Sequence, residues 1–205
     1  MNQTHVYIKN IENMSHVFDS IDYKRVIDTL QQYTYFESPP GVHRNNFIYF
    51  AGVGKNHDNL QQISKTWNSI GIKAINLDIN NCKHGDYGYI HNNSVIITTT
   101  KSGNTEEIVE FYKLLNNTNK STRKILIHSN QGCELLKYCD TDLYIPCDSE
   151  ADRLNILPTC SLINYTILLN SIGLEVVGDR LSFQMINNHH PGGNIGIITS
   201  HEKRE

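Results

Sequence analysis

No stretch of this 205-residue sequence has the composition of a membrane span or a secretory leader. No run approaches the roughly 20 consecutive apolar residues that cross a bilayer. Residues 1–10 contain no apolar core of the kind that a signal peptide needs. Repeats and low-complexity linkers are also absent. A chain that is 39% hydrophobic can bury a substantial core at this length, so we expect one globular domain in the cytoplasm.

Charge and cysteine content exclude several further classes. The formal net charge is -3, whereas a nucleic-acid-binding protein needs a concentrated basic surface. The five cysteines are odd in number and form no CxxC pair, which favours reduced thiols in a cytosolic compartment over a disulfide framework. Because no His/Cys group has the spacing of zinc ligands, we expect no metal.

Short apolar runs alternate with helical patterns through the middle of the chain. Near-continuous apolar runs are typical of parallel strands covered on both faces, so this order predicts an α/β fold with a parallel sheet between helices. The predicted strands span residues 47–51, 74–77, 95–99, 125–127 and 143–145. The predicted intervening helices span residues 59–70, 105–115 and 134–138.

Helical patterns also flank this alternation. Residues 11–36 have apolar residues at helical spacing, and the Ser-Pro-Pro-Gly segment at 38–41 ends that pattern. Residues 159–174 are apolar almost all round, which predicts a buried helix. Ligands of such sheets bind outside the carboxyl ends of the strands, and we expect the site there.

One segment at such a strand end is suited to a phosphate. Ser102, Gly103, Asn104 and Thr105 follow the third predicted strand and open a helix, where hydroxyls, free N–H groups and the positive helix end converge on an anion. The competing interpretation is a helix cap, with Asn104 capping and Glu107 at the reciprocal position. From this segment alone the two interpretations are about equal.

Other polar segments are less specific when taken singly. Gly54 and Lys55 form a turn that presents an ammonium group, but they match neither a nucleotide phosphate loop nor the dinucleotide fingerprint. His84 lies in a polar loop, where a histidine is usually exposed without a role. Glu150 precedes a helix start, which favours an acidic residue anyway. His190 precedes a proline and two glycines, as in a C-terminal turn.

In this order, the polar segments together resemble the sugar isomerase (SIS) domain, and more narrowly the arabinose-5-phosphate isomerases. The resemblance covers about residues 45–196. It is carried by Gly52-x-Gly54-Lys55, His84-Gly85-Asp86-x-Gly88, Ser102-Gly103-x-Thr105-x-Glu107-Ile108, Glu150-Ala151, Leu157-Pro158-Thr159-x-Ser161 and His190-Pro191-Gly192-Gly193-x-x-Gly196. It implies a flavodoxin-like three-layer αβα sandwich around a five-stranded parallel sheet. Residues 1–205 would form one SIS domain, with a helical segment over about 1–40 and an α/β core over about 45–196.

The same resemblance implies an activity. The family interconverts D-ribulose 5-phosphate and D-arabinose 5-phosphate by enediol acid/base chemistry without a cofactor, in carbohydrate metabolism that leads to the lipopolysaccharide sugar Kdo. It is usually a homo-tetramer with sites shared between subunits. The matching catalytic positions are Lys55, His84, Glu107, Glu150 and His190. The matching substrate-binding positions are Gly54, Thr100, Ser102, Gly103, Asn104, Thr105, Thr159 and Ser161.

Isomerisation needs a base that removes the proton alpha to the carbonyl and an acid that protonates the carbonyl oxygen. We expect Glu150 or Glu107 to be the base and His190 to open the ring or protonate the carbonyl. Lys55 and His84 would polarise the oxygens of the enediolate.

Departures from the family pattern bear on affinity and on regulation. Asn56 stands where a serine is common, and Lys101 and Asn104 replace a common asparagine and glutamate. Many members continue into a pair of CBS modules after the HPGG segment, and we expect this chain to act without them. Two alternatives remain, a non-catalytic sugar-phosphate sensor and a phosphoheptose isomerase. The acid/base set and the absence of a helix-turn-helix pattern favour the isomerase over the sensor.

Overall fold

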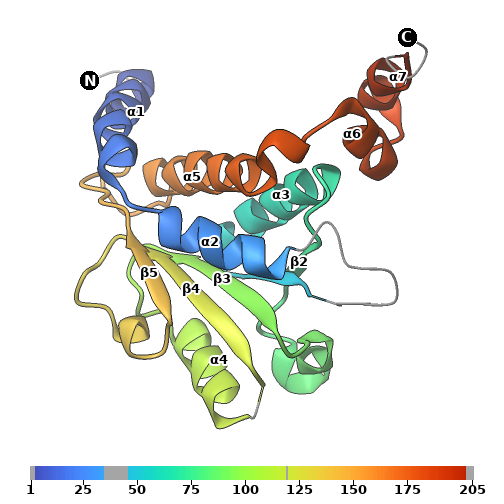
Figure 1. Ribbon diagram of the computed structural model, residues 1–205. Helices are drawn as coiled ribbons and strands as arrows, with labels where there is room; N and C mark the ends of the chain where they lie inside the picture. Colours follow the sequence, from blue (N-terminus) through green and yellow to red (C-terminus); the bar gives the residue numbers. More distant parts are fainter. Residues whose placement is uncertain (1–2, 35–45, 119, 202–205) are drawn as a thin grey trace.

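Five parallel strands form the centre of the computed structural model, which describes residues 3–34, 46–118 and 120–201. The strands lie side by side in the order β2-β1-β3-β4-β5 (Figure 1). Their bounds are β1 (Ile48–Ala51), β2 (Ala74–Leu77), β3 (Ser94–Thr100), β4 (Thr122–His128) and β5 (Thr141–Tyr144). Consecutive parallel strands require crossover connections, and these carry the helices that cover the sheet.

Helices cover both faces of this sheet, which makes three layers. In Figure 1, α2, α3 and α5 lie on one face and α4 on the other, while α1 and the α6–α7 pair extend beyond the two ends of α5. The α-helices are α1 (Gln3–Ser20), α2 (Lys24–Tyr33), α3 (Lys55–Ser69), α4 (Glu106–Asn117), α5 (Cys160–Val177), α6 (Phe183–His189) and α7 (Gly193–His201). Short 3-10 helices are η1 (Cys82–His84), η2 (Asp86–Tyr89), η3 (Glu134–Lys137) and η4 (Gly178–Arg180).

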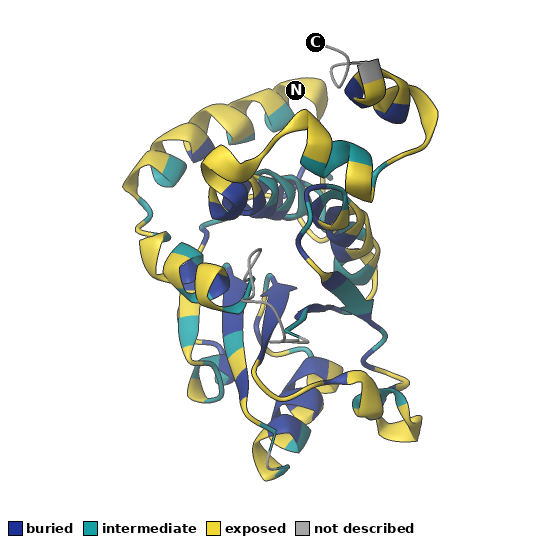
Figure 2. Ribbon diagram, turned by 45° about the vertical axis from the view of Figure 1, so that its right-hand side comes forward, coloured by how far each residue is buried: buried dark blue, intermediate teal, exposed yellow. Residues whose placement is uncertain are grey.

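The pleat of the strands divides the core in two. Successive side chains of a strand point to opposite faces, so Ile48 and Phe50 pack beneath α2, α3 and α5 while Tyr49 and Ala51 pack against the α4 side. All four residues of β1 and all seven of β3 are buried. Figure 2 shows this burial along the strands and the mostly exposed surfaces of α1, α6 and α7.

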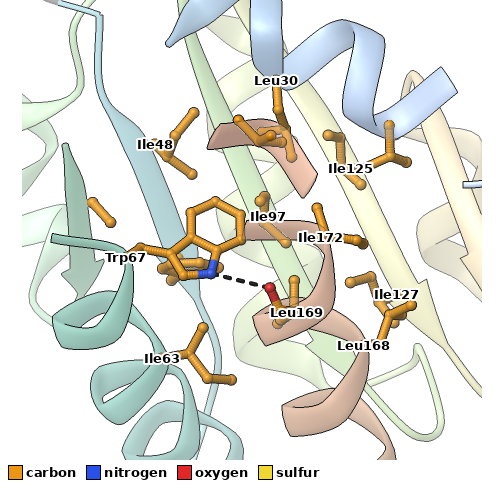
Figure 3. Packing of buried hydrophobic residues seen from close by; sticks show 14 of the residues in the cluster. Leu30, Ile48, Ile63, Trp67, Ile97, Ile125, Ile127, Leu168, Leu169 and Ile172 are labelled. Carbon is orange, nitrogen blue, oxygen red and sulfur yellow. Dashed lines mark hydrogen bonds between the residues drawn. The ribbon is translucent and has the colours of Figure 1, made fainter. Parts of the chain in front are cut away.

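A tryptophan fixes the packing of α3 against α5. Trp67 is fully buried, and its Nε1 donates a hydrogen bond of 3.0 Å to the carbonyl oxygen of Leu169 (Figure 3). Its ring lies edge-on to Phe50, with centroids 5.0 Å apart. A Cβ atom at Gly173 would lie 2.5 Å from Trp67 Nε1, so the glycine permits the close approach of the two helices.

The strands, their parallel arrangement, the main helices and the N-terminal helices confirm the α/β prediction. The helical pattern of residues 11–36 is divided between two helices, because α1 begins earlier, at Gln3, and the chain turns between α1 and α2. The Asp22 carboxylate accepts a hydrogen bond from the Lys24 N–H, a local contact that competes with helical pairing. Residues 35 and 36 and the predicted stop at 38–41 lie outside the described residues.

The helical pattern predicted at residues 134–138 corresponds to the short 3-10 helix η3 (Glu134–Lys137) and not to an α-helix. The backbone N–H of Leu135 donates to the carbonyl of Gly103 at 3.4 Å, so this connection is pinned to the loop after β3 and does not extend as a helix over the sheet.

The expectation that no segment reaches the length of a membrane span needs a correction. Residues 160–180, which include α5, are long and apolar enough by length and composition alone. However, α5 is the core helix that covers the sheet, and ten of its side chains are buried. Its apolar character therefore reflects packing on the sheet and on α2 and α3.

Candidate functional site

A pocket opens where the carboxyl ends of β1 and β3 meet. The chain leaves β1 into α3 on one face and leaves β3 into α4 on the other, which is the geometry that creates a crevice in an open parallel sheet (Figure 1). The pocket has a volume of about 590 Å³. Its lining residues are Val53, Gly54, Lys55, Asn56, Thr100, Lys101, Ser102, Thr105, Ile108, Ser129, Asn130, Ile156 and Pro158.

The loop between β3 and α4 turns tightly at the pocket. Gly103 has φ +64°, and its N–H donates to Thr100 Oγ1 at 3.2 Å. The Asn104 N–H donates to Ser102 Oγ at 3.3 Å. Thr105 is the N-cap of α4, and no side chain in the described chain caps that end. The first N–H groups of α4 therefore remain available to an anion.

The interpretation of this loop as an Asn104–Glu107 capping box was wrong. Asn104 Oδ1 accepts a hydrogen bond of 2.8 Å from the Glu134 N–H in the next connection, so the amide cannot also cap α4 in this geometry. Glu107 is exposed on the first turn of α4, and the structure gives its carboxylate no hydrogen bond or ion pair to any described residue.

The segment after β4 supports this loop from behind. The Ser129 N–H donates to the carbonyl of Lys101 at 3.3 Å, and Asn130 Nδ2 donates to the carbonyl of Ser102 at 2.8 Å. His128 is buried below them, with its Nδ1 2.8 Å from the carbonyl oxygen of Asn130. The loop after β3 is thus fixed by one backbone hydrogen bond and one side-chain hydrogen bond from this segment.

A second helix end faces the same pocket. Gly54, with φ +57° and ψ -130°, is the N-cap of α3 and offers no side chain to its N–H groups. Lys55 is the first helical residue and is exposed at the pocket. Asn56 lies beside it, and its Oδ1 accepts a hydrogen bond of 3.1 Å from Thr99 Oγ1. Two uncapped helix N-termini and an ammonium group make the pocket electropositive.

Glu150 lies behind the pocket as a buried, fully paired carboxylate. Thr159 donates to Oε2 from both its N–H (2.8 Å) and its hydroxyl (3.0 Å), and the Ser161 N–H adds a third bond of 3.2 Å. Oε1 accepts from the Ser161 hydroxyl at 2.7 Å and pairs with Lys101 Nζ at 2.9 Å. Burial opposes ionisation, but the hydrogen bonds from Ser161, Lys101 and Thr159 outweigh it and lower the pKa of Glu150 from 4.5 to about 2.

Of the expected catalytic residues only Lys55 lines the pocket, because Glu107 and Glu150 are not lining residues and both histidines lie away from it. His84 is exposed at the end of η1, before Gly85. His190 is the C-cap of α6, and its Nδ1 lies 3.0 Å from Ser69 Oγ at the last residue of α3. Lys55 begins that helix, and fourteen rises of 1.5 Å separate its two ends by about 20 Å. Within one chain, His190 and Lys55 therefore do not share a site.

Several lining residues were not among the expected site positions. Lys101 was noted only as a departure, and Ser129 and Asn130 were not considered. The latter two directly follow β4, so the rule that ligands bind at the carboxyl ends of strands could have found them. Among the described residues, no three His, Cys, Asp or Glu side chains gather as a metal site requires.

Comparison with known proteins agrees with this architecture, although no family model matches the chain. The chain is 28% identical over 196 residues to arabinose 5-phosphate isomerase KpsF of Escherichia coli O6:H1, covering 91% of this chain and 53% of that protein. A structure of an Escherichia coli CFT073 protein in complex with arabinose 5-phosphate superimposes with a TM-score of 0.78 at 23% identity, covering 93% of this chain and 100% of that one. The chain has the sugar isomerase (SIS) domain fold.

This SIS domain also shares its fold with a protein that was solved with a different ligand. The Vibrio vulnificus NanR protein, solved as a complex with ManNAc-6P, matches with a TM-score of 0.66 at 13% identity, covering 98% of this chain and 67% of that one. The SIS domain spans about half the length of the curated relatives it matches, and some of those relatives have no assigned activity. These similarities establish the fold, and the reaction is a separate question.

The tight contact behind Gly103 generates a prediction for this SIS domain. A Cβ atom at Gly103 would lie 2.3 Å from Cys133 Cβ and 2.4 Å from its Sγ, and the φ of +64° disfavours any side chain. Gly103→Ala should lower the free energy of unfolding by about 2–4 kcal/mol, from overpacking and backbone strain together. Urea titration followed by the fluorescence of Trp67, the single tryptophan, measures this loss.

Gly132→Ala is the matched control in the neighbouring connection, because its Cβ would meet only Asn130 Oδ1 at 3.7 Å. The control should change the free energy of unfolding by less than about 1 kcal/mol. Equal losses in both variants would show that the contact with Cys133 does not constrain the loop.

Proposed function

We propose that this SIS domain is an aldose–ketose isomerase that interconverts D-ribulose 5-phosphate and D-arabinose 5-phosphate. The observation that carries the proposal is the convergence of two uncapped helix N-termini, Lys55 and several hydroxyls on one pocket at the switch point of the sheet. That arrangement suits a phosphate monoester next to a small polyol. The similarity to named arabinose 5-phosphate isomerases supports the choice of substrate.

The phosphate would bind in the loop after β3. Ser102 and Thr105 line the pocket with Thr100 beside them, and the free N–H groups of α4 point to the same place. The hydroxyls of Thr159 and Ser161, by contrast, donate hydrogen bonds to Glu150. We therefore leave these two residues out of the proposed phosphate ligands. Asn104 is likewise outside the lining and paired with the backbone of Glu134.

The carboxylate that takes the substrate proton is Glu107 in this proposal. A general base needs a pKa near the working pH, and the five donors around Glu150 hold its pKa at about 2. Glu107 is not a lining residue, but it is exposed on the first turn of α4, whose N-terminus opens into the pocket, and it carries no hydrogen bond or ion pair to a described residue. Lys55, at the mouth of α3, would stabilise the negative charge that develops on the enediolate.

His84 and His190 enter the proposed site from neighbouring subunits. His190 lies about 20 Å from Lys55 along α3 within one chain, so a shared site is the arrangement that brings the two together. The helix that follows His190 exposes apolar side chains that a subunit interface would cover. These are Ile195, Ile197 and Ile198, which are 45%, 58% and 50% exposed. We therefore propose a homo-oligomer, with a tetramer as in the family.

A non-catalytic sugar-phosphate sensor is the second candidate. It is favoured by the immobilised state of Glu150 and by the distance of His84 and His190 from the pocket in one chain, because a sensor needs the phosphate loop without an acid/base set. A sensor and an isomerase would share the phosphate loop and differ in turnover. Phosphoheptose isomerase is the alternative within the enzyme class.

One assay separates these functions. The purified SIS domain, incubated with ribulose 5-phosphate without nicotinamide or ATP, should form arabinose 5-phosphate, because aldose–ketose exchange is redox-neutral. A parallel incubation with sedoheptulose 7-phosphate tests the heptose alternative, and chromatography resolves the products. Binding of either sugar phosphate without product at any pH would contradict the isomerase and favour the sensor.

Removing two hydroxyls tests the phosphate site. Ser102→Ala with Thr105→Val should raise KM, or the Kd for the sugar phosphate, roughly 100-fold or more, since each hydrogen bond to a charged group contributes about 1.5–3 kcal/mol. Ser121→Ala with Thr29→Val is the control, because Ser121 lies next to the opposite end of β4 and Thr29 lies on α2. An unchanged KM in the first pair would place the phosphate elsewhere.

Subunit complementation tests the shared site. Lys55→Met and His190→Ala should each abolish most turnover, whereas their co-expression with different tags should restore activity in the purified mixed oligomer. Random assembly leaves about a quarter of shared sites with both native residues, so recovery should approach that fraction. No recovery in a stable mixed oligomer, or full activity from a monomer in light scattering, would contradict the shared arrangement.

A further inference from the structure

Lys101 and Glu150 join two separate walls of the pocket. Lys101 belongs to the loop after β3 and lines the pocket, while Glu150 belongs to the segment between β5 and α5. Lys101 Nζ lies 2.9 Å from Glu150 Oε1. The side chain of Lys101 is 35% exposed and that of Glu150 is 0% exposed, so the pair reaches from the pocket surface into the interior.

The ion pair compensates a charge that is costly to bury. An ionised carboxylate inside a protein needs hydrogen bonds and an opposite charge. Thr159 and Ser161 supply the hydrogen bonds, but these groups are neutral. Lys101 is the one cation at ion-pair distance from Glu150 in the described ranges 3–34, 46–118 and 120–201.

Other titratable groups around Glu150 do not take over this role. Cys147 and Cys160 flank it, and burial raises the pKa of Cys147 to about 11 and also raises the pKa of Cys160. Burial likewise raises the pKa of Tyr165 on α5, so all three stay neutral while a carboxylate titrates. The charged residues on the far side share a cavity wall with Glu150 and form no ion pair with it. They are Lys9 on α1 and Asp148, Asp152 and Arg153 in its own segment.

The carboxylate in turn organises the rim of the pocket. By accepting from the backbone and hydroxyl of Thr159, Glu150 ties its own segment to the start of α5. The intervening residues Ile156 and Pro158 line the same pocket as the loop between β3 and α4. A movement of Glu150 would therefore displace one wall of the pocket relative to the other.

We propose that Lys101 is a positioning residue that holds Glu150 ionised and fixed, so that Glu150 anchors the rim and another group takes the substrate proton. The second half of this statement rests on the proposed isomerase function, whereas the first half concerns the folded protein alone. An uncharged side chain at position 101 would leave the buried carboxylate without an ion pair.

Carboxyl-carbon NMR tests the pair without relying on activity. In protein labelled with ¹³C at the glutamate carboxyls, the Glu150 signal is assigned by its loss in Glu150→Gln. The native signal should titrate well below those of exposed glutamates. Lys101→Met should raise its midpoint by about one pH unit or more, because an opposite charge at this distance lowers a carboxyl pKa by about 1–3. Lys101→Arg should restore most of the native midpoint.

Lys113→Met is the matched control, since it removes a lysine from a surface pair with Glu134 at 3.4 Å and leaves the Glu150 environment intact. The midpoint of Glu150 should not move in this variant, and circular dichroism verifies that each variant is folded. If the titration midpoint of Glu150 is unchanged in folded Lys101→Met, Lys101 does not hold Glu150 ionised, and this part of the proposal is overturned.

A kinetic arm tests the second half on ribulose 5-phosphate. With Lys101 present, Glu150 stays ionised over the pH range in which the enzyme works. Its protonation therefore causes no loss of kcat/KM on the acidic side of the pH profile. In Lys101→Met the pKa of Glu150 in the folded protein is raised, so protonation of Glu150 begins at a higher pH. On acidification kcat/KM should therefore begin to fall at a higher pH than in the native protein, whatever its plateau value. An NMR shift with an unchanged pH profile would overturn the role in catalysis. If the native protein shows no turnover, the isomerase function fails while the NMR result still decides the ion pair.

Discussion

The crevice between β1 and β3 is the constraint on which the rest of the site depends. Since α3 and α4 leave neighbouring strands toward opposite faces, no helix covers the sheet at that point, and the N-termini of both helices open into the same space. Each brings unpaired N–H groups and a positive dipole end. Charged and hydroxyl side chains then need only short loops to reach a bound anion. In the proposed function the backbone therefore supplies the anion affinity, and the side chains determine the reaction of the bound group.

The layered fold was predictable because its signals are local. The buried strands are nearly continuous apolar runs, and the amphipathic or apolar helices between them have clear helical periods. The differences arose at hydrogen bonds, some local and some between distant segments, that the apolar spacing does not encode. The turn at Asp22 separates α1 from α2 although the apolar spacing continues through it. Residues 134–137 form a 3-10 turn because the loop after β3 pins them, which no local pattern indicates.

Part of the pocket lining was predictable from the sequence, but the contacts among the candidate site residues were not. Motif order selected Ser102, Thr105 and Lys55, which do line one pocket. It could not show that Thr159 and Ser161 donate to Glu150, because this needs the path of the chain between β5 and α5. Nor could it show that Asn104 is bound to the next connection or that His190 contacts the far end of α3. These facts depend on three-dimensional proximity between segments distant in sequence.

Helix α3 connects the pocket to the C-terminal arm, which is the α6–α7 pair, as a single rigid element. Its first residue, Lys55, faces the pocket, and its last, Ser69, contacts His190. Trp67 lies two residues before that contact and is bonded to α5. The emission of this single tryptophan thus comes from the junction of α3, α5 and the arm. Intrinsic fluorescence offers a label-free optical signal for any rotation of α3 when an anion occupies the other end of the helix.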